Sequence, residues 1–159
     1  MDSLTKSLRK YLDSVKISHT TMYNTDCGNK IGNPTSTCFI CECGNNTDRE
    51  VSIVIDIYPM DYMFFLSAYP NVIISRENID KMHALEMKWN RSGFMSTLVI
   101  EEEKGVVMPD IYCFKLTTCG FSGENGLEDS VWKRYIDKIE QEYSYIEEHI
   151  KDVSDDLPF

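Results

Sequence analysis

The pattern of apolar and polar positions predicts groups of strands between helices. Leu4, Leu8, Leu12 and Val15 recur at helical spacing with charged residues between them, which indicates an amphipathic first helix. From residue 35 the apolar period changes to two, and strands are predicted at residues 37–43, 51–58 and 62–69. The polar stretch over residues 18–34 is interpreted as a loop, with room for a short strand near residues 20–23.

The second half of the chain repeats this alternation. A helix is expected from an N-cap at Ser75 to Trp89, and Asn90 and Gly93 end it. A hairpin follows, with strands at residues 94–101 and 110–118, and then a loop that contains Gly120, Gly123 and Gly126. The last helix has apolar positions at alternating spacings of four and three, namely Trp132, Ile136, Ile139, Tyr143, Ile146 and Ile150.

The predicted order of elements is therefore α-β-β-β-α-β-β-α. Short connections between strands favour antiparallel pairing, and helices that are separated from the strands in sequence favour one face of the sheet. We predict an α+β fold, an antiparallel five-stranded sheet with helices on one face. The length of 159 residues suits a single domain over residues 1–159.

Charge and composition narrow the classes of function. The chain has 26 acidic and 16 basic residues and a formal net charge of -10, which disfavours binding to nucleic acid. No apolar run approaches about 18 residues, so no membrane span is expected. The N-terminal residues lack the continuous apolar segment of a signal peptide, and the six cysteines are then expected to be reduced thiols in the cytoplasm.

The strands carry more apolar side chains than one buried face of a sheet needs. Val51, Ile53, Ile55 and Ile57 are expected to pack against the helices, and the alternate face should then be polar if it met only water. We predict instead that this alternate face binds a partner protein, through Phe39, Val54, Tyr58, Met63, Phe65, Tyr69 and Tyr112. Self-association, or an assignment of strand faces that is wrong by one residue, is the alternative.

The middle helix has apolar residues on more than one side. Met82, Leu85, Met87 and Trp89 are predicted to form a homodimer interface, with packing inside one chain as the alternative.

The cysteines Cys27, Cys38, Cys41 and Cys43 are the strongest candidates for chemistry. Four thiolates satisfy a structural zinc, but this spacing fits no common zinc site, and on a strand Cys38 points away from Cys41 and Cys43. We therefore expect small thiols without a metal or cofactor, and we keep a zinc- or redox-responsive regulator as the alternative function. His19, His83 and His149 lie on separate elements, no catalytic motif is present, and no enzymatic activity is expected.

Residues 53–150 resemble YbjN-like proteins and type III secretion chaperones. The resemblance lies in the strands that precede a helix ending at Trp89-Asn90, in the hairpin turn at Lys104-Gly105, and in a closing helix with aromatic and Ile positions. It implies a chaperone-like domain, usually dimeric, that binds extended segments of other proteins without catalysis. Asn90 is the one polar position that the resemblance carries over, with a structural role in ending the helix. The expected function is a non-enzymatic, chaperone-like or regulatory module that holds a segment of a partner protein.

Overall fold

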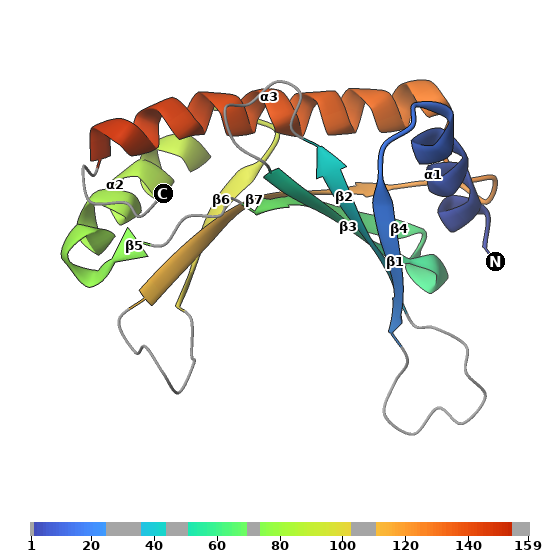
Figure 1. Ribbon diagram of the computed structural model, residues 1–159, viewed down its shortest axis with the longest axis horizontal. Coiled ribbons are helices and arrows are strands. Elements are labelled where there is room, and N and C mark those ends of the chain that lie inside the picture. Colours follow the sequence, from blue (N-terminus) through green and yellow to red (C-terminus); the bar gives the residue numbers. More distant parts are fainter. Residues whose placement is uncertain (1, 25–35, 44–50, 70–73, 103–110, 154–159) are drawn as a thin grey trace.

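The computed structural model describes residues 2–24, 36–43, 51–69, 74–102 and 111–153. Their elements follow one another as α1 (Ser3–Ser14), β1 (His19–Asn24), β2 (Ser36–Cys43), β3 (Val51–Tyr58), β4 (Met63–Tyr69), β5 (Ile74–Ser75), α2 (Ile79–Asn90), β6 (Thr97–Glu102), β7 (Ile111–Phe121) and α3 (Asp129–Val153) (Figure 1). Short 3₁₀ turns at Pro59–Asp61 and Arg76–Asn78 precede β4 and α2. The predicted hairpin turn at residues 103–105 lies outside the described residues.

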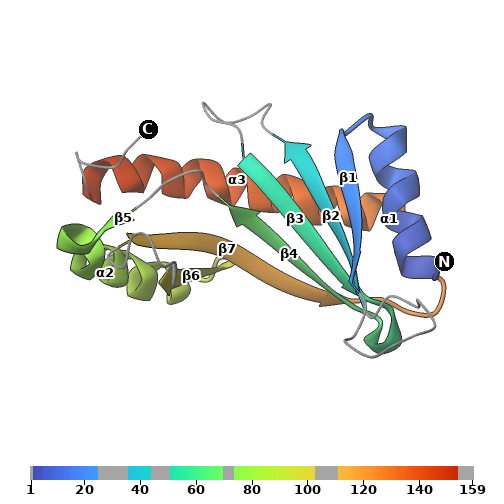
Figure 2. The ribbon, with the colours of Figure 1, turned by 60° about the horizontal axis from the view of Figure 1, so that its bottom comes forward.

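All strands of the described chain join one antiparallel sheet in the order β1-β2-β3-β4-β7-β5, and β6 pairs with the other side of β7. Helix α3 runs across the sheet, with α1 near one of its ends and α2 near the other (Figures 1 and 2). The helices of the described residues leave the opposite face of the sheet uncovered, and the sheet bends so that this face lies on the inside of the bend (Figure 1). The predicted α+β class is confirmed.

The predicted count of five strands is wrong, because the sheet of the described chain has seven. One additional strand is β1, which lies where the sequence left room for a short strand near residues 20–23 but was not counted, because HTTMYN has too few apolar residues to show a clear period of two. The other is β5, which has only two residues, Ile74 and Ser75, and gives no pattern. Ser75 is therefore a strand residue and not the N-cap of α2, which begins at Ile79.

The core fills the space between the sheet and the helices. Alternate residues of β3 and β4 point into it, namely Ile53, Ile55, Ile57, Phe64, Leu66 and Ala68. The predicted apolar positions of the last helix meet them from α3, where Trp132, Ile136, Ile139, Tyr143 and Ile146 are all buried. Leu4, Leu8 and Leu12 extend this core along α1. The helical spacing in the sequence therefore predicted the buried side of both helices, with one exception: Val15 follows the end of α1 and is 44% exposed. The side chain of Ile150 lies outside the described residues.

Helix α3 ties the two ends of the molecule together. Near its start, the Trp132 indole Nε1 donates a hydrogen bond to the Ser7 hydroxyl of α1 at 3.1 Å. In its second half, the buried carboxylate of Glu142 accepts hydrogen bonds from the backbone N–H groups of Met95 and Ser96, which lead into β6. None of the described helices combines the length and the apolar character needed to cross a membrane.

Candidate functional site

The uncovered side of the sheet, called the open face below, is built by the strand residues that alternate with the core residues. Strand register places their side chains in rows that cross the sheet. One row runs through Cys38, Asp56, Phe65 and Cys119, and a second runs through Tyr58, Met63 and Phe121. A third row begins with Ile40 and Val54 and continues through Ser67 and Thr117.

Apolar side chains gather in these rows. We define the apolar stripe as Met22, Ile40, Val54, Tyr58, Met63, Phe65 and Phe121. Phe121 is 69% exposed and Met22 is 50% exposed, and the other members are partly buried. The rings of Tyr58 and Phe65 meet edge to face, with centroids 5.7 Å apart. This contact holds both rings in place before any partner arrives.

The stripe crosses neighbouring strands β1, β2, β3, β4 and β7. It therefore spans four interstrand distances of about 4.8 Å, or roughly 19 Å. An extended segment of about six residues has this length. The members of the stripe come from three neighbouring rows, and Asp56 lies among them. An apolar patch of this extent on the side that the described helices leave uncovered favours contact with another polypeptide over exposure to water.

Five of the seven predicted partner-binding residues lie on the open face: Val54, Tyr58, Met63, Phe65 and Tyr69. The assignment was wrong for Phe39 and Tyr112. Phe39 pairs with Ile55, so its side chain shares the helix-covered face, and it is fully buried. Tyr112 lies two residues before the buried Phe114 in β7, so its side chain points to the same, helix-covered face, and it packs against the core.

Sequence reasoning missed Met22, Ile40 and Phe121. The predicted strand ended at residue 118, whereas β7 continues through Gly120 to Phe121. Extending the alternation of β7 past Thr118 places Cys119 and Phe121 on the open face with Lys115 and Thr117. The signal for Phe121 was therefore present, but the interpretation of Gly120 as a loop residue hid it.

The other end of the open face is polar. Lys115 Nζ lies 2.8 Å from Glu101 Oε1 and 5.7 Å from the centre of the Tyr69 ring. The hydrogen bond to Glu101 raises the pKa of Lys115 above its ordinary value, so the ammonium stays charged. Tyr69 therefore belongs to a charged cluster and not to the apolar stripe. A partner on the open face would meet an apolar region and a charged border.

The predicted dimer residues of α2 are mostly inside the molecule. Met82, Leu85 and Trp89 are buried, and the Trp89 indole donates a hydrogen bond to the carbonyl of Ser96 at 3.1 Å. These three residues pack within the chain's own core, which contradicts their assignment to an exposed interface. Met87, at 53% exposure, is the member of the set that remains at the surface.

The cysteines of β2 divide between the two faces, as the strand pattern predicted. Cys41 is buried in the core, and Cys38 is on the open face beside Asp56. Burial raises the pKa of the Cys41 thiol to about 12. Burial, with a smaller contribution from the Asp56 charge, raises the pKa of Cys38 to about 11. Because Cys38 and Cys41 point to opposite faces of the sheet, their thiols do not meet at one metal ion.

The remaining two candidates of this cysteine group are not placed. Cys27 and the side chain of Cys43 lie outside the described residues. Within the described residues, no three His, Cys, Asp or Glu side chains come close enough to hold a metal ion. The histidines contact residues near them in sequence: His19 lies 3.8 Å from Asp13, and His83 lies 3.5 Å from Glu86.

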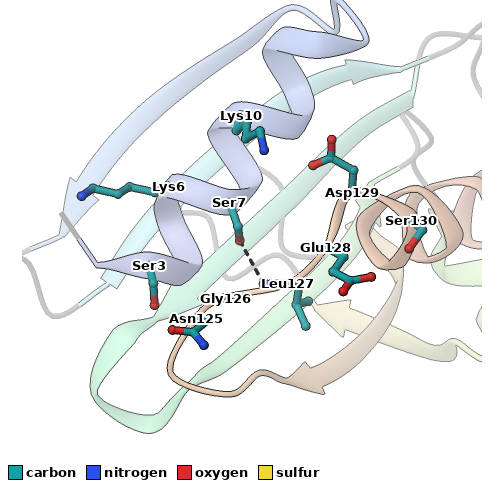
Figure 3. A pocket seen from close by; sticks show the side chains of 10 residues that line it. All are labelled: Ser3, Lys6, Ser7, Lys10, Asn125, Gly126, Leu127, Glu128, Asp129 and Ser130. Carbon is teal, nitrogen blue, oxygen red and sulfur yellow. Dashed lines mark hydrogen bonds between the residues drawn. The ribbon is translucent and has the colours of Figure 1, made fainter.

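A separate hollow of about 810 Å³ lies between α1 and the segment that leads into α3 (Figure 3). Lys10, Glu128 and Asp129 line it, so both charge signs are present. Its central hydroxyl, Ser7, donates to the Leu4 carbonyl and accepts from the Leu127 N–H and the Trp132 indole. This hydroxyl is thus used in joining α1 to α3, and Figure 3 shows Lys6 extending away from the hollow.

Comparisons with protein-family models, with curated proteins and with solved structures found no match for this chain.

Proposed function

We propose that this protein is a non-enzymatic, chaperone-like module that holds a segment of a partner protein on the open face of its sheet. The observation that carries the proposal is the apolar stripe, which crosses the sheet on the side that the described helices leave uncovered. Covering this stripe removes apolar surface from water, at about 25 cal/mol per Å² before the costs of association.

The order of elements supports the same proposal. Without the edge strand β1 and the two-residue β5, the described elements follow α-β-β-β-α-β-β-α. This is the order on which the resemblance to YbjN-like proteins and secretion chaperones rests. The net charge of -10 favours partner segments that combine apolar and basic residues.

The test is a binding titration with defined peptides. Fluorescein-labelled peptides of about twelve residues, alternating Leu or Phe with Lys, match the length and chemistry of the stripe. Their dissociation constants are measured by fluorescence anisotropy. We expect Phe65→Asp and Phe121→Asp to raise Kd about tenfold or more, since a tenfold change needs only about 1.4 kcal/mol.

Ser52→Asp is the matched control, because it adds the same charge to an exposed position of the open face outside the stripe. We expect its Kd to stay within about twofold of the wild type. Far-UV circular dichroism checks that each variant is folded. Because Phe121 is highly exposed, Phe121→Asp is the variant less expected to disturb folding. Absence of peptide binding to the wild type, or equal weakening by Ser52→Asp, would refute the proposal.

A further inference from the structure

Strand β1 leaves one edge of the sheet without a hydrogen-bonded neighbour. The N–H of Glu42 in β2 donates to the carbonyl of Ser18 at 3.0 Å. Backbone N–H and C=O groups of an antiparallel strand alternate in direction from one residue to the next. The backbone groups of Thr20 and Met22 therefore face β2, and those of His19, Thr21 and Tyr23 point away from the sheet. In the part of the chain that the structure describes, no hydrogen bond reaches these outward backbone groups.

The opposite edge of the sheet is closed by side chains of α2. Asn90 donates to the Leu98 carbonyl at 3.1 Å and accepts from the Leu98 N–H at 2.8 Å. Glu86 accepts from the Ile100 N–H at 3.2 Å. The outward N–H groups of Leu98 and Ile100 and the Leu98 carbonyl are thus occupied, and Glu101 adds charge to this strand. A head-to-tail chain of molecules, joined β1 to β6, is therefore blocked.

The sequence of β1 lacks the residues that usually protect an edge, although α1 lies beside the strand (Figure 2), where Arg9 donates to the Tyr23 hydroxyl at 3.0 Å and Asp13 lies 3.8 Å from His19. The β1 sequence HTTMYN contains no Lys, Asp, Glu or Pro, although the chain as a whole carries a net charge of -10. Two adjacent large side chains of β1, Met22 at 50% and Tyr23 at 53% exposure, also remain in contact with water. The side chains of β1 itself include no Lys, Arg, Asp or Glu, and the neighbouring Arg9 and Asp13 have opposite charges. Two copies of this acidic chain therefore meet with little charge repulsion at this edge, which favours a second copy as the occupant.

We propose that two copies of this chain pair antiparallel through β1 around a two-fold axis at Thr21. In this register Thr21 faces the partner's Thr21, and Tyr23 faces the partner's His19, so all the outward backbone groups of residues 19–23 find partners. Thr–Thr and aromatic pairs are favourable across antiparallel strands. In a two-fold interface both molecules use the same surface, so assembly stops at the dimer, because the β6 edges stay closed. The proposal does not depend on what the open face binds.

The test is the self-association of the purified chain, measured by sedimentation velocity between about 1 and 200 µM. We expect a monomer–dimer equilibrium. Thr21→Pro removes an outward N–H that the monomer does not use, and we expect it to raise the dimer Kd at least about tenfold. Met22→Asp brings carboxylates close to the axis and should act in the same direction even if the proline variant folds poorly.

Met87→Asp is the control, because it replaces another exposed methionine, on α2 and away from β1, with the same charge. We expect its dimer Kd to stay within about twofold of the wild type. A wild type that remains monomeric at the highest concentration would overturn the proposal. So would a dimer that persists in both β1 variants, or one that Met87→Asp dissociates as strongly as they do.

Discussion

At the scale of residues, Glu142 shows how a single buried carboxylate fixes a connection between elements. Its oxygens accept from the Met95 N–H at 3.1 Å, and from the Ser96 N–H and hydroxyl at 2.8 Å each. A buried carboxylate is costly unless several donors surround it, and these three donors meet that need. This role was not predictable from the sequence, because a glutamate next to an apolar helix position ordinarily faces water.

Cys41 makes the stability of the protein depend on pH in the alkaline range. Burial raises the pKa of its thiol from 9.0 to about 12, so the folded state holds this proton more tightly than the unfolded state. The resulting stabilisation is complete below the unfolded pKa and is lost as pH rises toward the folded pKa. Between these values, the free energy of unfolding should fall by up to about 1.4 kcal/mol per pH unit from this thiol.

Urea unfolding at about pH 8, 9.5 and 10.5 measures this slope. Cys41→Val keeps an apolar side chain of similar size but has no proton to lose. We expect the variant to lose less stability than the wild type over this range, and the difference isolates Cys41 from other titrating groups. Parallel curves for the two proteins would contradict the expectation.

At the scale of elements, β7 is the strand that joins the two parts of the sheet. Residues 116–121 pair with β4, and residues 112–117 pair with β6 on the other side. Gly120 lets this strand pass beneath the Phe64 ring, since a Cβ atom there would lie 2.4 Å from the ring. The ring has no room to move away, because Trp132 and Tyr135 pack against it with centroids 4.8 and 5.1 Å distant.

Gly120→Ala is therefore expected to destabilise the fold by about 1–3 kcal/mol through overpacking. Gly123→Ala is the matched control, because a Cβ at Gly123 would meet no atom within 4 Å. Thermal or urea unfolding of the two variants gives the comparison. Equal stability of both variants would mean that Phe64 can move, and that the close contact at Gly120 is not required.

Elements with a strong pattern were predictable, and those fixed by long-range contacts were not. The β-branched run of β3 and the 4–3 spacing of α3 depend on local sequence, and both elements lie close to where the sequence placed them. For β1 the sequence only left room for a short strand near residues 20–23, because this strand forms by pairing with β2, and six residues of mixed polarity do not show that pairing. Phe39 was assigned to the wrong face because the register of β2 depends on its pairing with β3.

At the scale of the whole molecule, the net charge of -10 opposes the proposed contact between two copies. The side chains of β1 include no Lys, Arg, Asp or Glu, so the strand itself contributes no ion pair across the two-fold axis, and the main electrostatic effect is repulsion between the two acidic molecules. Salt screens such repulsion, since the Debye length falls from about 14 Å at 0.05 M to about 4 Å at 0.5 M.

We therefore expect the dimer Kd to fall severalfold as the salt concentration rises from about 0.05 to 0.5 M. Sedimentation velocity at both concentrations measures the change, and Thr21→Pro should sediment as a monomer in each. Weaker dimerisation at high salt would contradict this expectation, because it would indicate ion pairs in the interface, which the residues of β1 themselves do not provide.

The position of α3 in the chain has a consequence for synthesis. The ribosome makes β3, β4 and β7 before Asp129–Val153, yet Ile136, Ile139 and Tyr143 of α3 cover the apolar side of those strands. A nascent chain that has reached β7 thus exposes apolar residues on both sides of its sheet. A premature stop codon after β7 should yield an aggregating product and not a weakened protein, and the growing polypeptide needs protection until its last helix leaves the exit tunnel.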